Sequence, residues 1–165
     1  DKMDPLPTSK FPDISEEQKA WDREEWRVSE QVSQFNYILR EKGRDFALNR
    51  FKDGYGYFLA ARVRVPFFAP PRAFILYLCW EQANLRGNSV TLEKLTDHEA
   101  LIRMTLLFFE LYQAASHLKD QISFEDFRLI FETIWQDRAE KAGWKLKIEY
   151  GGEYPGAICV FHFTR

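Results

Sequence analysis

Residues 55–80 read Y-G-Y-F-L-A-A-R-V-R-V-P-F-F-A-P-P-R-A-F-I-L-Y-L-C-W, and they decide the fold expected for this chain. Residues 55–65 alternate, and one set of alternate positions predicts the buried face of a half-buried strand: Tyr55, Tyr57, Leu59, Ala61, Val63 and Val65. Residues 73–80 are apolar without a break and rich in ring and branched side chains, which predicts a central strand covered on both faces. We therefore expect two strands joined by the loop V-P-F-F-A-P-P-R, residues 65–72.

A long helix is predicted upstream, between Ser15 and Gly43. Ser15 suits a helix cap, and Glu16 and Glu17 suit the positive end of the helix dipole. Gly43 is a typical C-terminal stop. One stripe of the helix is apolar and holds Trp21, Val28, Val32, Phe35 and Leu39.

Two further helices and a hairpin are predicted downstream. The sequence T-D-H-E at 96–99 has the form of a capping box, so a second helix is expected to begin at Thr96. A third is expected from Ser123 to Gly143. Alternating residues at 144–150 and 157–163 predict a terminal β-hairpin. The apolar face expected for the second helix comprises Leu101, Met104, Leu107, Phe108, Leu111, Tyr112 and Ala115.

This order of elements predicts an α+β fold. It has a largely antiparallel four-stranded sheet, built of two β-hairpins and packed with three helices. Residues 1–14 contain prolines at 5, 7 and 12, which favour an extended N-terminal arm. Residues 15–165 then form a single α+β domain, because their number suits one hydrophobic core.

Composition indicates an ordinary globular protein, since 45% of residues are hydrophobic, 29% are charged and 16% are aromatic. A net charge of −2 argues against a protein that coats nucleic acid through its overall field. We expect no signal peptide and no membrane span, because neither pattern is present. Cys79 and Cys159 stand inside apolar runs, so we expect buried free thiols in a cytoplasmic or other reducing intracellular compartment.

Catalytic and metal-binding patterns are not recognisable. His98, His117 and His162 have no short ligand spacing, so no metal site and no cofactor are expected. Asp53 and Gly54 are interpreted as a turn, since a phosphate loop would join a strand to a helix. An enzyme is therefore not the leading hypothesis. A small enzyme or a binder of an apolar ligand, with no recognisable motif, is kept as the third.

Residues 40–72 carry eight basic residues against three acidic ones. Interleaved with aromatic residues, such a segment favours a nucleic-acid surface, in which guanidiniums contact phosphates and rings stack on bases. In the competing interpretation, these basic side chains form ion pairs with the acidic N-terminal helix. The nucleic-acid hypothesis names Arg44, Arg50, Lys52, Arg62 and Arg64.

Phe67 and Phe68 have two interpretations. They fold back to cap the core, or they stand out as a rigid apolar tip between Arg64 and Arg72 and bind a partner. The leading functional hypothesis follows from the second: a non-enzymatic interaction or regulatory adaptor module that binds another protein. Self-association through the 15–43 helix is a further expectation.

Overall fold

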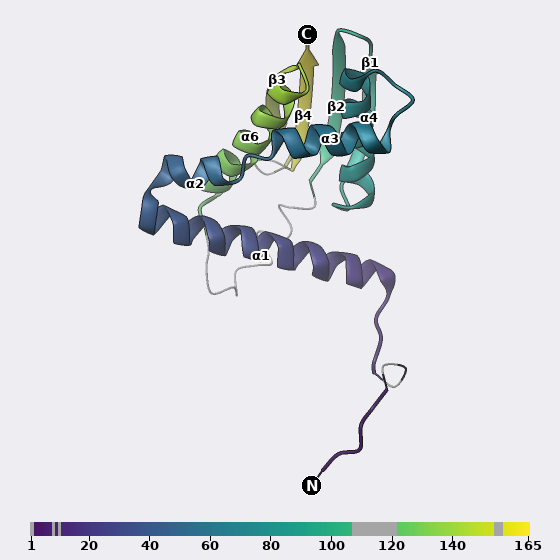
Figure 1. Cartoon of the computed structure of the whole chain (residues 1–165), viewed down its shortest axis with the longest axis vertical. Helices are drawn as coiled ribbons and strands as arrows, with labels where there is room; N and C mark the ends of the chain where they lie inside the picture. The colour runs from purple at the N-terminus through teal and green to yellow at the C-terminus, as the bar shows by residue number, and fades with distance from the viewer. Residues whose placement is uncertain (1, 8, 10, 107–121, 154–156) are drawn as a thin grey trace.

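The computed structural model describes residues 2–7, 9, 11–106, 122–153 and 157–165. Helices and strands alternate in groups along these residues (Figure 1). The helices are α1 (Glu16–Lys42), α2 (Arg44–Arg50), α3 (Gly54–Arg64), α4 (Pro70–Asn84) and α6 (Phe124–Lys141). The strands are β1 (Ser89–Leu95), β2 (Glu99–Thr105), β3 (Lys145–Gly151) and β4 (Ile158–Thr164).

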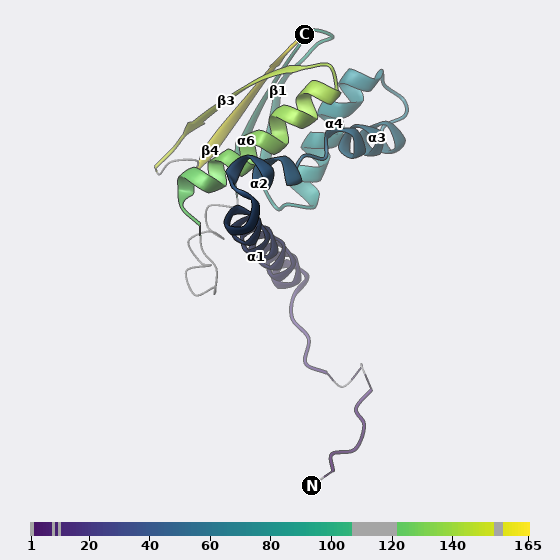
Figure 2. The ribbon, with the colours of Figure 1, turned by 60° about the vertical axis from the view of Figure 1, so that its left-hand side comes forward.

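The sheet has the order β1-β2-β4-β3, and every neighbouring pair is antiparallel. Two hairpins therefore lie side by side and join through β2 and β4, where Ile102 is opposite Phe161 and Met104 is opposite Cys159. These four side chains are buried beneath helices that cover one face of the sheet (Figure 2). The predicted α+β class and four-stranded antiparallel sheet are confirmed.

The predicted first helix is confirmed as α1. The Ser15 hydroxyl accepts a hydrogen bond from the Gln18 backbone N–H at 3.1 Å, and Gly43 ends the helix with a φ of 89°. Val28, Val32 and Phe35 are buried in a second core between α1, α2 and α6. Because this stripe packs within its own chain, self-association through α1 would need the opposite face, where Trp26 and Tyr37 are exposed.

The predicted helix from Ser123 is confirmed as α6, and the terminal hairpin is confirmed as β3 and β4. The Ser123 hydroxyl accepts a hydrogen bond from the Asp126 backbone N–H at 3.1 Å. Phe127 and Ile130 of α6 belong to the core with α1, while Trp135 and Ala139 belong to the core under the sheet. The helix therefore connects the two cores.

The prediction of a strand at 55–65 is wrong, because this segment is α3. Gly54, Tyr57 and Ala61 are buried at intervals of three and four residues, which is the spacing of one helix face. Gly54 also allows close contact with α6, since a Cβ there would lie 2.7 Å from the backbone oxygen of Asp137. The apparent alternation arose because the outer face of α3 is apolar as well.

The prediction of a strand at 73–80 is also wrong, because this segment lies in α4. Pro70 and Pro71 occupy the first helical positions, where a missing N–H costs no hydrogen bond. Phe74, Ile75 and Leu78 are fully buried, so the continuous apolar run belongs to a core helix. Periodicity alone does not separate a short buried helix from a buried strand.

The helix predicted from Thr96 is wrong over the described residues, where a turn after β1 and then β2 replace it. The Thr96 hydroxyl does accept hydrogen bonds from the N–H groups of His98 and Glu99, at 3.2 and 3.0 Å. The same local hydrogen bonds thus close a hairpin turn here. Leu101 and Met104 lie in β2. Outside the described residues lie Leu107, Phe108, Leu111, Tyr112 and Ala115.

The N-terminal residues before α1 run away from the body of the molecule (Figure 1). Met3, Leu6, Phe11 and Ile14 are exposed there. The division into an arm and one domain stays a prediction. Among the described residues, no helix combines the length and the hydropathy that crossing a membrane requires.

Candidate functional site

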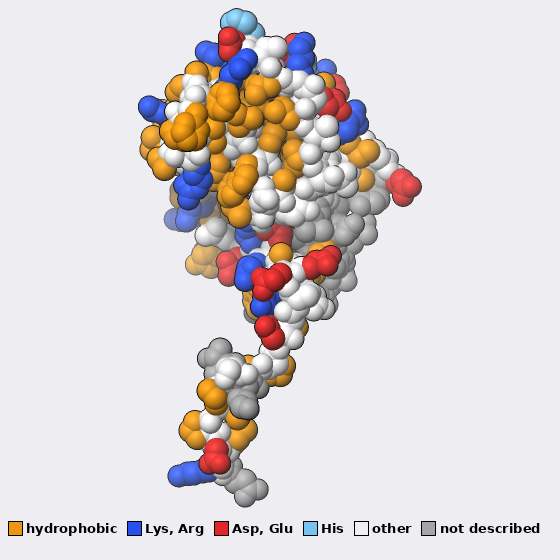
Figure 3. Space-filling model, turned by 90° about the vertical axis from the view of Figure 1, so that its right-hand side faces the viewer, with side chains coloured by type: hydrophobic (Ala, Val, Ile, Leu, Met, Phe, Trp, Pro, Cys, Tyr) orange, Lys and Arg blue, Asp and Glu red, His pale blue; other side chains and the backbone are white. Residues whose placement is uncertain are grey.

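Large apolar side chains are exposed along α3 and in the loop that follows it. Tyr55, Leu59 and Val63 are four residues apart on the outer face of the helix, and Phe67 and Phe68 follow in the loop, where Phe68 lines one groove with Leu59 and Val63. We call these five residues the α3 surface. Figure 3 shows hydrophobic side chains gathered on this side of the molecule, with basic side chains at the margin. Exposed apolar patches typically mark interaction sites.

The loop does not cap the core. Phe67 is 88% exposed and Phe68 is 46% exposed, so the interpretation in which both rings fold back over the sheet is wrong. Pro66 and Pro70 bracket the two rings and restrict the backbone on both sides. A shallow groove of about 560 Å³ runs beside Phe68. It is lined by Leu59, Arg62, Val63, Pro66, Phe68 and Pro70.

The inner face of α3 is held firmly against α6. The Gly54 backbone N–H donates to Asp137 Oδ2 at 2.8 Å, and the Arg138 guanidinium lies 4.1 Å from the centre of the Tyr57 ring. Arg138 also makes two hydrogen bonds of 2.8 Å to Asp53, directly before α3. These charge-assisted contacts fix the helix, so its outer stripe is presented on a rigid element.

The α3 surface has a positive margin. Residues 54–72 contain Arg62, Arg64 and Arg72 and no acidic residue. Arg72 forms an ion pair with Asp97 at 3.1 Å, and the Arg62 guanidinium lies 5.8 Å from the centre of the Phe58 ring. Arg62 and Arg64 are exposed and form no ion pair with any described residue. Their charge is therefore not neutralised by any described carboxylate.

Of the five basic residues that the nucleic-acid hypothesis names, one already forms an ion pair with a described residue and four do not. Arg44 forms an ion pair with Asp126 of α6. Arg50 and Lys52, like Arg62 and Arg64, are exposed and have no ion pair in the described part of the chain. Over the residues that it describes, the structure therefore does not show the expected ion pairs between these five basic residues and α1, the acidic N-terminal helix.

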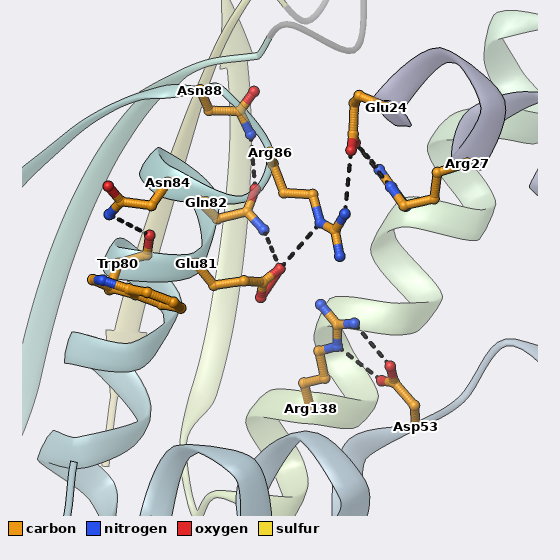
Figure 4. A network of polar contacts seen from close by, with 10 residues as sticks. All are labelled: Glu24, Arg27, Asp53, Trp80, Glu81, Gln82, Asn84, Arg86, Asn88 and Arg138. Atoms are coloured by element: carbon orange, nitrogen blue, oxygen red, sulfur yellow. Dashed lines mark hydrogen bonds and ion pairs between the residues drawn. The ribbon is translucent and has the colours of Figure 1, made fainter. Parts of the chain in front are cut away.

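A buried polar network, which the sequence did not indicate, lies between α1, the end of α4 and α6 (Figure 4). Glu24 pairs with Arg27 and accepts a hydrogen bond from Arg86 at 3.2 Å. Glu81 Oε1 accepts from Gln82 at 3.1 Å and from Arg86 at 3.4 Å. Glu24 stands among several acidic residues of α1. The sequence pattern therefore does not predict that Glu24 is buried while the other acidic residues of the helix are not.

This network borders a cavity of about 300 Å³ that also touches Phe131 and Trp135. Burial, followed by the nearby charge of Glu81, raises the pKa of Tyr57 well above its ordinary value. Neither the Tyr57 hydroxyl nor Glu81 Oε2 makes a hydrogen bond of ordinary geometry to another described residue, although the two groups are close enough to interact. The arginines and carboxylates around the cavity pair with one another, which is the usual condition of buried charges.

The predicted thiols are both free. Cys159 is buried and Cys79 is partly exposed. Burial raises the pKa of Cys79 to about 11, and burial together with the charge of Glu132 raises the pKa of Cys159 to about 12. Neither is an activated nucleophile.

The histidines do not meet in one place. His162 in β4 contacts Glu99 at 2.9 Å, His98 lies in the β1–β2 turn, and His117 lies outside the described residues. Within the residues described, no group of three or more His, Cys, Asp or Glu side chains is placed to hold a metal ion.

Comparisons with models of protein families, with curated proteins and with solved structures found no match to this chain.

Proposed function

We propose that this protein is a non-enzymatic interaction module that binds an apolar, acidic segment of a partner protein on the α3 surface. The observation that carries the proposal is the exposure of Phe67 in the loop that directly follows α3, whose outer face exposes Tyr55, Leu59 and Val63. Rigid aromatic side chains beside arginines are the composition of binding hot spots. Arg64 and Arg72 flank the two phenylalanines in sequence, and Arg64 is the one without an ion pair among the described residues.

The chemistry of the partner follows from the charges. Because residues 54–72 contain no acidic side chain, carboxylates on the partner meet Arg62 and Arg64 without repulsion. Apolar side chains of the partner then enter the groove beside Phe68. The prolines of the loop limit its motion, so less entropy is lost when the complex forms.

A peptide library tests the proposal while the partner is still unidentified. Purified protein is expected to enrich segments that combine apolar with acidic residues. The variant Phe67→Ser with Phe68→Ser is expected to lose this enrichment. The matched control, Trp26→Ser with Tyr37→Ser, removes two exposed rings from α1 and is expected to keep it. Equal enrichment by the two double variants would contradict the proposal.

Nucleic-acid binding is the second candidate, supported by the absence of ion pairs at Arg50, Lys52, Arg62 and Arg64 among the described residues. Binding through several phosphates weakens steeply as salt rises. Retention on heparin at low salt that is lost at moderate salt, and reduced by Arg50→Ala with Lys52→Ala, would favour this candidate. If the protein passes through the heparin column at low salt without being retained, nucleic-acid binding is no longer a candidate function.

A further inference from the structure

The cavity between α1, the end of α4 and α6 has the chemistry of a second binding site, and it shares no residue with the α3 surface. We propose that this cavity binds a small neutral molecule of two fused aromatic rings with one ring N–H, the class of indole, and that Glu81 Oε2 accepts the hydrogen bond of that N–H. This binding is separate from that of a partner protein on the α3 surface.

The volume of the cavity sets the size of the ligand. It is about 300 Å³, whereas a cavity of about 150 Å³ is enough to bind one benzene ring. Twice that volume accommodates two fused rings. It also stands at the lower end of the range that is usual for small-molecule sites. A two-ring molecule therefore fits, and a large cofactor does not.

One buried acceptor in the wall of the cavity lacks a partner. Glu81 is 4% exposed, and its Oε2 atom makes no hydrogen bond of ordinary geometry to a described residue. Among the buried side-chain atoms of the described residues that line the cavity, it is the one in this condition. Even where the neighbouring Tyr57 hydroxyl donates to it, a carboxylate oxygen keeps a second lone pair. A ligand N–H supplies the missing donor.

The other oxygen of Glu81 holds the carboxylate in place. Oε1 accepts hydrogen bonds from Gln82 at 3.1 Å and from Arg86 at 3.4 Å. Gln82 in turn accepts a hydrogen bond from Asn88 at 2.8 Å. Figure 4 shows this chain of contacts and the side chain of Glu81 extending from α4 toward Arg86 and Arg138. An acceptor that is already held in position loses little entropy when a ligand binds.

The charges around the cavity favour a neutral ligand. Its described lining residues include three arginines and three acidic residues, and each of them pairs with a residue of opposite charge. An ionic ligand would leave one charge unbalanced in a buried site, whereas a neutral ligand leaves every pair intact. These six residues are Glu24, Arg27, Asp53, Glu81, Arg86 and Arg138.

The rest of the wall is largely apolar and aromatic. Leu106, Phe127 and Trp135 line it and are 3–4% exposed. The rings of Phe131 and Trp135 meet edge to face, with centroids 6.4 Å apart. A flat aromatic ligand gains ring contacts here. A purine base of similar size carries several acceptor nitrogens, which an apolar wall leaves unpaired, so the cavity favours an indole over a purine.

Calorimetric titration of the full chain with three probes tests the inference. The probes are indole, benzofuran, in which an oxygen replaces the N–H, and adenine. Indole is expected to bind at least tenfold more tightly than benzofuran, because a ligand without the donor leaves the buried acceptor unpaired. Adenine is expected to bind at least tenfold more weakly than indole. The inference is overturned if no probe binds, or if benzofuran or adenine binds as tightly as indole.

Two variants place the binding in this cavity. Ile134→Trp fills the cavity and leaves the contacts of Glu81 intact, so it is expected to abolish indole binding. Its matched control, Tyr37→Trp, changes an exposed ring of α1 and is expected to keep that binding. Glu81→Leu removes the acceptor and is expected to bind indole and benzofuran equally, with circular dichroism showing whether it is folded. Unchanged indole binding by Ile134→Trp would overturn the inference even if Glu81→Leu does not fold.

Discussion

Arg138 of α6 donates two hydrogen bonds of 2.8 Å each to Asp53, and the same guanidinium lies over the ring of Tyr57. One side chain thereby joins α6 to the start of α3. The row of exposed apolar residues on the outer face of α3 depends on this attachment for its rigidity. We therefore expect stability at this contact and the proposed binding at the α3 surface to be linked.

Removing the carboxylate tests the attachment. Asp53→Ala is expected to lower the free energy of unfolding by about 1–3 kcal/mol, because a charge-assisted hydrogen-bond pair is lost. The lower half of that range is expected, since Asp53 is half exposed and water replaces part of the interaction. Asp53→Asn keeps one acceptor and is expected to lose less. If the urea unfolding curves of both variants match the native curve, the contact between Asp53 and Arg138 contributes nothing to the free energy of unfolding.

The two phenylalanines of the loop and a core phenylalanine provide a matched comparison. Phe67→Ser with Phe68→Ser is expected to leave the melting temperature nearly unchanged, because the rings are exposed. Phe74 is fully buried, and Phe74→Ala is expected to cost about 3–5 kcal/mol. Thermal unfolding followed by circular dichroism measures both. A large loss of stability in the loop variant would mean that the rings serve the core.

Much of the fold could be predicted from the sequence, and the errors have a common physical origin. The helices α1 and α6 carry clear caps and one apolar stripe each, so their boundaries were predictable. In contrast, α3 is apolar on both faces, because Tyr57 and Ala61 face the core while Leu59 and Val63 face outward. Local rules are expected to fail where a surface serves binding.

The remaining errors reflect ambiguous local signals. The continuous run in α4 suits a buried helix as well as a buried strand. The turn at Thr96 makes the hydrogen bonds that a helix cap also makes. The buried network of Glu24, Glu81 and Arg86 depends on long-range packing, which no local pattern encodes.

Glu99 gives a prediction for acid pH. Hydrogen bonds from Lys94 and from His162 lower the pKa of its carboxyl group. A lowered pKa stabilises the folded state at pH values above the ordinary glutamate value of about 4.3, and this contribution is lost as the pH falls through the folded value. Unfolding curves between pH 3 and pH 7 are expected to show a smaller acid-induced loss for Glu99→Gln. If the native protein and Glu99→Gln lose stability equally as the pH falls, the hydrogen bonds to Glu99 do not contribute to stability.

The thiols give a prediction for chemical reactivity. At pH 8 an ordinary thiol is partly ionised, whereas burial and pKa values of about 11 and about 12 keep Cys79 and Cys159 neutral. Modification by a disulfide reagent is expected to be about a hundredfold slower in the native protein than in denaturant. Cys79 is expected to react first, because it is partly exposed. Immediate reaction of both thiols in the native protein would contradict their burial.

The most direct test of the account is photo-cross-linking from position 67. A photoreactive phenylalanine analogue replaces Phe67 in one protein and Trp26 in a control, since both side chains are strongly exposed. The account predicts that position 67 cross-links to a defined apolar and acidic segment and that the control position does not. It also predicts that Arg62→Glu with Arg64→Glu abolishes the product. Equal, unselective cross-linking from both positions would contradict the claim that the α3 surface is a docking site.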